Sequence, residues 1–133
     1  TDGMTDSEGR PKRVAIFATH IGVALIAQTV LRRHDFDVIY SKDFKKKEEV
    51  ENHIRDICVL NPDWVFLTNF VIDVADDIAS QMKILSPNMI VAGISTYKVH
   101  YQIETTPQFL DYVHYYPLAT PHLEEAIQHL SQL

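Results

Sequence analysis

The stretch that decides the fold is Pro62–Asn69, which reads PDWVFLTN. Four consecutive apolar residues between a proline turn and polar residues are typical of a strand that is buried on both faces of a sheet. In open parallel α/β sheets, chemistry collects just beyond the carboxyl ends of the strands. A carboxylate at position 68 would indicate a phosphoacceptor or a magnesium ligand, so Thr68 argues against both.

Apolar runs and helical spacings alternate strictly along the rest of the chain. Short runs such as VAIFA at 14–18 predict strands, and apolar residues spaced three and four apart predict helices. A last helix is marked by Thr120 as its N-cap and Pro121 in its first turn. The predicted strands are 14–18, 37–40, 64–67, 89–93 and 112–115, and the predicted helices before the last are 22–33, 48–60, 76–85 and 97–110.

Five βα units of this size predict a flavodoxin-like (βα)5 fold. Each right-handed crossover places a helix on the sheet, so the sheet is parallel and covered on both faces, giving an α/β sandwich of three layers. The strand order expected at this size is 2-1-3-4-5. Residues 1–12 are expected to be a flexible lead-in, and residues 13–133 a single domain.

Composition excludes several classes of function. The chain has 133 residues, of which 46% are hydrophobic, and a formal net charge of −6. That charge argues against affinity for nucleic acid. No apolar run approaches the ~18 residues that span a bilayer, and no signal-peptide core is visible. We therefore expect a cytoplasmic protein with no membrane contact. The only basic run, 45–47, is followed at once by acidic residues and predicts a solvated loop entering a helix.

Two segments resemble the receiver domain of bacterial response regulators. Residues 62–73 are similar to the receiver's third strand and the acidic loop after it. Residues 112–127 are similar to its last strand, proline turn and final helix. The resemblance covers nearly the whole chain from Lys12 onward, and it implies a signalling or regulatory module.

The charged residues that the resemblance implies for phosphoryl chemistry are replaced. Receivers place an acidic pair after the first strand, where this chain has Ala18-Thr19-His20, and Thr68 stands at the phosphoacceptor position. Phosphorylation of an aspartate needs a carboxylate nucleophile and a magnesium ion held by acids. The resemblance therefore implies a pseudo-receiver that is not phosphorylated. Its degenerate pocket, or a ligand site in the same place, would comprise Thr19, His20, Thr68, Asn69, Ser95, Thr96 and Tyr116.

The chain also resembles the cobalamin-binding-like domains. His20 stands where such domains carry the lower cobalt ligand, and Thr68–Phe70 and Ala92-Gly93 stand at their other two motifs. This second resemblance implies a corrinoid, a tetrapyrrole or another planar ligand at the sheet edge. Ala18 replaces the aspartate that would orient the histidine, which would weaken ligation. The leading expectation is therefore no cofactor, with cobalamin as the alternative.

The tyrosines of the fourth and fifth βα units form a candidate interface. Tyrosine supplies contact area and a polar tip, which favours protein–protein surfaces. Receivers commonly dimerise through this face, so the resemblance implies a protein partner or a homodimer there. The alternative is that these rings pack beneath the fourth helix. No catalytic constellation or metal-ligand spacing is visible, and we expect no enzymatic activity. The candidate interface residues are Tyr97, Tyr101, Tyr112 and Tyr115.

Overall fold

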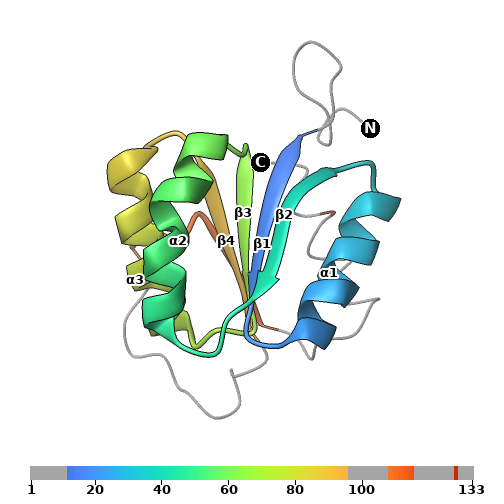
Figure 1. Cartoon of the computed structure of the whole chain (residues 1–133), viewed down its shortest axis with the longest axis horizontal. Helices are drawn as coiled ribbons and strands as arrows, with labels where there is room; N and C mark the ends of the chain where they lie inside the picture. Colours follow the sequence, from blue (N-terminus) through green and yellow to red (C-terminus); the bar gives the residue numbers. More distant parts are fainter. Residues whose placement is uncertain (1–11, 96–107, 116–127, 129–133) are drawn as a thin grey trace.

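The computed structural model describes residues 12–95, 108–115 and 128 of the chain. Five parallel strands form one sheet in the order β2-β1-β3-β4-β5, with helices on both of its faces (Figure 1). This confirms the predicted fold class and strand order. The elements are β1 (Arg13–Ala18), α1 (Ile21–Arg33), β2 (Asp37–Asp43), α2 (Lys47–Leu60), β3 (Trp64–Thr68), α3 (Ile72–Leu85), β4 (Ile90–Ser95) and β5 (Tyr112–Tyr115).

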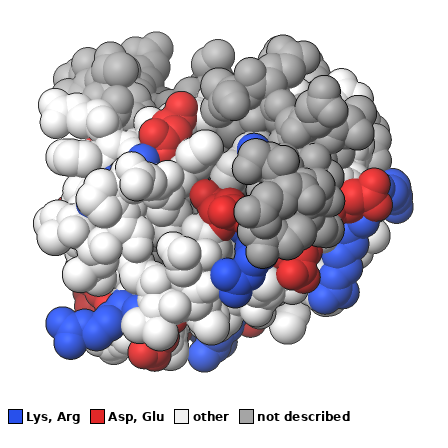
Figure 2. All heavy atoms as spheres, turned by 90° about the horizontal axis from the view of Figure 1, so that it is seen from above, with Lys and Arg blue, Asp and Glu red and all other residues white. Residues whose placement is uncertain are grey.

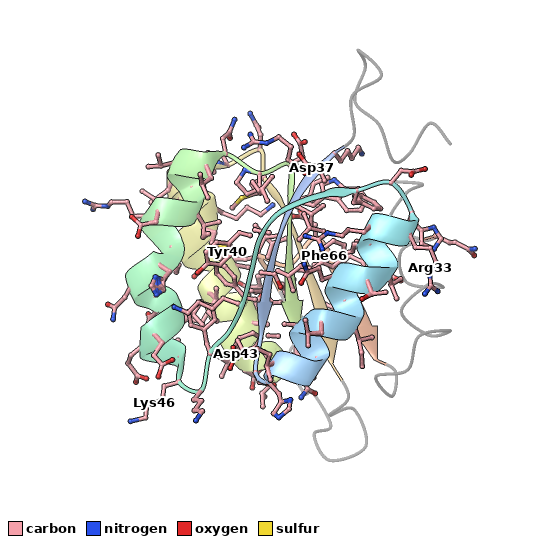
Figure 3. The ribbon with its side chains drawn as sticks, turned by 45° about the vertical axis from the view of Figure 1, so that its right-hand side comes forward. Arg33, Asp37, Tyr40, Asp43, Lys46 and Phe66 are labelled. Carbon is pink, nitrogen blue, oxygen red and sulfur yellow. The ribbon has the colours of Figure 1, made fainter. Side chains whose placement is uncertain are left out.

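Alternation along the central strands assigns each side chain to one of two cores. In β3, Trp64 and Phe66 pack in the core under α1, whereas Val65 and Leu67 pack under α2 and α3. Figure 3 shows the same division, with Phe66 and Tyr40 on opposite sides of the sheet. All five residues of β3 are buried. Burial of each large apolar side chain contributes about 2 kcal/mol, so these two cores hold the layers together.

The β1–β2 pairing contains an irregularity. Val14 pairs with Val38 and Ala15 with Tyr40, so Ile39 has no partner on β1. This is a β-bulge, which bends the strand locally and increases its twist. Because β2 is at the edge of the sheet, the bulge shapes that edge and not the interior.

Helix α3 begins earlier than the sequence indicates. It starts at Ile72, not at residue 76, because Asn69 adopts a left-handed conformation with φ of 64° and reverses the chain directly after β3. Asparagine tolerates this conformation better than most residues. The apolar run at 70–72 thereby leads into the helix, with residues 70 and 71 in the short loop and Ile72 as the first helical residue. Strand β2 likewise extends to Asp43, beyond the predicted end at residue 40.

The predicted fourth helix, 97–110, lies outside the described residues as far as residue 107. Its last three residues, 108–110, form a bend and not a helix, which corrects that end of the prediction. Of the last predicted helix only Gln128 is described, and it is helical. Strand β5 covers 112–115, as predicted. Among the described residues, no helix is long and apolar enough to cross a membrane.

Figure 2 shows the amino-terminal edge of the sheet, seen from above. Acidic and basic side chains of the described residues lie interspersed on this face, without a continuous patch of one sign. A mixed surface of this kind gives no focused field for a highly charged partner.

Candidate functional site

A hollow of about 230 Å³ lies at the carboxyl edge of the sheet. Three segments surround it: the residue after β1, the loop from β2 to α2, and the loop from β3 to α3. In Figure 3 this edge is at the bottom, where Asp43 and Lys46 are labelled. Open α/β folds bind ligands at this edge, so the hollow is the candidate site. Its lining residues are Thr19, Phe44, Lys45, Lys46, Lys47, Asn69, Phe70, Val71 and Val74.

Two of the predicted site residues, Thr19 and Asn69, are brought together here. The Nδ2 of Asn69 donates to the Oγ1 of Thr19 at 3.0 Å, and that hydroxyl donates to the carbonyl of Asn69 at 3.4 Å. The backbone N–H of Asn69 also donates to the carbonyl of Ile94 at 2.6 Å. These bonds join the ends of β1, β3 and β4 across the edge of the sheet.

Thr68 does not line the hollow. It pairs with Ala18 at the end of the sheet, its exposure is 0%, and its hydroxyl donates to the carbonyl of Phe17 at 3.2 Å. Alternation along β3 places Thr68 on the same side as Trp64 and Phe66, facing α1, whereas the hollow lies on the side of α2 and α3. The predicted pocket residue Thr68 instead bonds to a buried carbonyl within the sheet, and it is not among the residues that line this hollow.

His20 is the N-cap of α1. Its Nδ1 accepts a hydrogen bond from the backbone N–H of Gly22 at 3.0 Å, and its side chain is exposed. Capping of this kind satisfies one of the N–H groups that a helix leaves without a partner. While Nδ1 accepts this hydrogen bond, the proton of the neutral ring is on Nε2, so ligation of a metal by Nε2 would require the loss of the cap.

Gly93 also fails to provide space for a cofactor. A Cβ at this position would lie 3.1 Å from Leu110 and 3.6 Å from Ile72, so apolar side chains already fill the place beside the strand. The residues at two of the cobalamin motifs therefore do not fit a corrin: the histidine is engaged as a cap, and the glycine receives Leu110.

The lysines of the hollow differ in their partners. Lys47 forms an ion pair with Asp77 on α3, and this hydrogen-bonded carboxylate raises the pKa of Lys47 above its ordinary value. The side chains of Lys45 and Lys46 are exposed, and no carboxylate of the described residues pairs with them. The sequence predicts a solvated loop for this run, and only the packing around it reveals the hollow.

The acidic magnesium site of a receiver has no counterpart in the described part of the edge. Ala18, Thr19 and Thr68 carry no charge, and no group of three His, Cys, Asp or Glu side chains able to hold a metal occurs among the described residues. Magnesium takes carboxylate oxygens and waters in near-octahedral geometry. The residues described at the ends of β1 and β3 do not fit that requirement.

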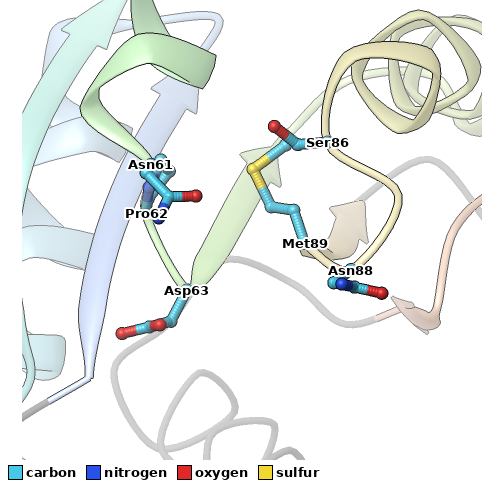
Figure 4. Close-up of a pocket in the computed structure, with 6 residues that line it drawn as sticks. All are labelled: Asn61, Pro62, Asp63, Ser86, Asn88 and Met89. Carbon is cyan, nitrogen blue, oxygen red and sulfur yellow. The ribbon is translucent and has the colours of Figure 1, made fainter.

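A second hollow, of about 330 Å³, lies at the opposite, amino-terminal edge. In Figure 4, Asn61, Pro62 and Asp63 lie on one side of it and Ser86, Asn88 and Met89 on the other. The Asp63 carboxylate accepts a hydrogen bond from the backbone N–H of Arg13 at 2.9 Å, which joins the residues at the starts of β3 and β1. This hollow lies away from the carboxyl ends of the strands, where ligands of such folds bind.

Other predicted residues are only partly described. Ser95 ends β4 and Tyr115 ends β5, and their side chains are not described; Tyr112 is half-buried and packs against the core under α1. The alternative of packing beneath the fourth helix concerns a segment that lies outside the described residues as far as residue 107, so the interface role of Tyr112 stays a prediction. The predicted residues Thr96, Tyr97, Tyr101 and Tyr116 lie outside the described residues.

Two aspartates near β5 have structural roles that the sequence analysis missed. The carboxylate of Asp76, on α3, accepts the backbone N–H groups of Gln108, Phe109 and Leu110 at 3.1, 2.8 and 3.0 Å. The carboxylate of Asp111 accepts from Lys83 on α3 at 2.5 Å and from a backbone N–H of β4 at 2.8 Å. Helix α3 thus holds the segment that enters β5. Sequence spacing gives no signal for these bonds, which join residues 20 or more positions apart.

Comparison with solved structures shows the same fold in response-regulator receivers. A response regulator from Thermotoga maritima matches with a TM-score of 0.68 at 16% identity, over 92% of this chain and 98% of that one. The BeF3-activated DrrB receiver domain matches with a TM-score of 0.63 at 14% identity, over 92% and 98%. A receiver domain protein from Clostridium thermocellum matches at 0.65 and 14%, over 91% and 94%. No protein-family model and no curated protein matches. The fold is receiver-like.

Replacing Asp76 by alanine is expected to lower the free energy of unfolding by about 2 kcal/mol, because three N–H groups lose a charged acceptor. Asp76→Asn keeps one acceptor oxygen and should lose about half as much. Amide hydrogen exchange should accelerate at Gln108, Phe109 and Leu110 and stay unchanged at β1. Asp56→Ala, at an exposed position on α2, is the control and should change stability by less than ~0.5 kcal/mol. Equal losses for both alanine variants would contradict this role of Asp76.

Titration with hydroxocobalamin is expected to leave the absorbance spectrum of the corrinoid unchanged, because Nδ1 of His20 is engaged by Gly22 and Leu110 occupies the space beside Gly93. The matched measurement uses His20→Ala. A spectral change in the wild-type protein that disappears in His20→Ala would overturn this expectation and restore the cobalamin interpretation.

Proposed function

We propose that this domain is a non-catalytic regulatory module, a pseudo-receiver that works without phosphorylation and through protein–protein contacts. The receiver-like fold supplies the frame. The observation that carries the proposal is Thr68, fully buried at the receiver's phosphoacceptor position with its hydroxyl bonded to the sheet. A hydroxyl with no exposure to solvent cannot meet a phosphodonor, and the ends of β1 and β3 offer no acidic ligands for magnesium.

Helix α3 gives this module a physical connection between its carboxyl edge and its fourth and fifth units. The helix begins at Ile72, directly after the Thr19–Asn69 pair, and Ile72 lies beside Gly93 of β4. Further along, Asp76 and Lys83 hold the residues that enter β5. In our proposal, a change at the edge reaches the contact surface through this helix. The contacts are made by a second copy of the domain or by another protein.

Incubation with magnesium and acetyl phosphate tests the absence of phosphorylation. The expected result is an intact mass without an added phosphoryl group, since the ends of β1 and β3 carry neither the nucleophile nor the magnesium ligands. Thr68→Asp should not restore the reaction, because it supplies one carboxylate of several. It should also destabilise the fold by about 3 kcal/mol or more, since that charge would be buried without a partner.

Thr68→Val is the matched control for that variant. It keeps the shape of the side chain and removes one hydrogen bond to Phe17, so a loss of about 1 kcal/mol is expected. A phosphoryl group found on an aspartate of the wild-type protein would refute the pseudo-receiver proposal. Phosphorylation of Thr68→Asp alone would show that the magnesium site is intact, and would contradict the part of the proposal that concerns the metal.

Self-association through the fourth and fifth units can be tested by photo-crosslinking. A benzophenone amino acid in place of Tyr101 is expected to give a covalent dimer on irradiation, because the proposed contact surface includes this position. The same probe in place of Arg55, exposed on α2, is the control and should leave the chain monomeric. Dimers from both positions in equal amount, or from neither, would contradict the homodimer form of the proposal.

A further inference from the structure

The hollow at the carboxyl edge has an apolar side. Phe44 and Phe70 are 1% and 6% exposed, and with Val71 and Val74 they form a wall between the β2–α2 loop and the start of α3. The ring of Phe44 packs edge-on against Phe17 at 5.2 Å between centroids, which fixes its position in the core. An apolar body placed against this wall would lose contact with water, which favours its binding.

The same hollow has a cationic rim. Lys45 and Lys46 line it with exposed side chains that pair with no carboxylate of the described residues, whereas Lys47 is engaged by Asp77. The acidic residues of this edge do not line the hollow. They are Asp43, Glu48, Glu49 and Asp73. Two lysine residues with exposed side chains therefore contribute to the rim of an apolar recess.

Polar groups add to this arrangement at two places. The hydroxyl of Thr19 and the amide of Asn69 form a bonded pair in the lining. Lys46 is the N-cap of α2 and has no side-chain acceptor for the first N–H groups of that 14-residue helix. A helix start carries partial positive charge, but Glu48 and Glu49 in the first turn offset it, and the Glu49 carboxylate accepts a hydrogen bond from the backbone N–H of Lys45 at 3.4 Å. The attraction of the rim for a negative group therefore rests on the side chains of Lys45 and Lys46, and the wall attracts an apolar group.

The size of the hollow limits the ligand. A volume of about 230 Å³ is below the ~300–1,000 Å³ of sites for drug-sized molecules and corresponds to roughly eight water molecules. A corrin, a tetrapyrrole or a nucleotide would extend well beyond this space. A single ring or a branched aliphatic chain with one anionic group fits.

We propose that this hollow binds a small organic anion, with its carboxylate or phosphate at Lys45 and Lys46 and its apolar body against Phe44, Phe70 and Val74. The site lies between the β2–α2 and β3–α3 loops and has no acidic ligands. It therefore requires a ligand of opposite charge to the magnesium ion of a receiver. The inference goes beyond the proposed function, because the hollow can be occupied whether or not the domain regulates a partner.

Amide chemical shifts of the full chain, followed by NMR during titration with benzoate, test this proposal. Benzoate is expected to shift the signals of Phe44, Lys46 and Asn69 in a saturable manner. Benzyl alcohol, which has the same ring without charge, and inorganic phosphate, which has the charge without the ring, should each bind at least about tenfold more weakly. Equal affinity for benzyl alcohol, or shifts that do not saturate at these residues, would overturn the proposal.

Charge substitutions locate the anionic group. Lys45→Gln with Lys46→Gln is expected to weaken benzoate binding about tenfold, as two partly exposed ion pairs are lost. Arg32→Gln with Arg55→Gln removes the same charge from exposed positions on α1 and α2 and should leave the affinity unchanged. Equal weakening in both double variants would show a general charge effect and would refute the site. The amide spectra of both variants report whether each one is folded. The test does not depend on whether the domain is phosphorylated or forms dimers, so its outcome is separate from that of the proposed function.

Discussion

The structure depends on the alternation of side chains along β1 and β3, the two central strands that are buried on both faces. Each residue of these strands belongs either to the core under α1 or to the core under α2 and α3. The same alternation continues into the polar residues at the ends of these strands. It sends Thr68 toward α1 and the residues after it in the opposite direction, so the register of two strands decides which polar groups reach the carboxyl edge.

The candidate site differs from that of an ordinary receiver in the residues that stand at the ends of the strands, and not in the alternation that places them. The position that would act as nucleophile faces the core, and its hydroxyl is bonded within the sheet. Thr19 and Asn69 face the other side and bond to each other, beside a loop that contributes lysines. A site built in this way is positive where a magnesium site is negative. The fold is receiver-like, whereas the charge of the residues at its carboxyl edge favours an anion over a magnesium ion.

Much of the fold could be predicted from the sequence, because apolar runs and helical spacings are local signals. The start of α3 could not, since the run at 70–72 continues an apolar strand and only the left-handed Asn69 separates the two. The candidate site was harder to predict from the sequence than the fold. The buried hydroxyl of Thr68 bonds to Phe17, 51 residues away, and the hollow beside Lys45 and Lys46 exists only because distant loops pack against each other.

The bulge at Ile39 has a consequence for how the domain meets its neighbours. A regular edge strand offers a continuous row of N–H and C=O groups on which a foreign strand can pair, and bulges and charged residues prevent this. Strand β2 has both, with Ile39 out of register and Lys42 and Asp43 at its end. The sheet is thus protected from extension on the β2 side, and copies of the domain can be crowded together without forming a continuous intermolecular sheet there.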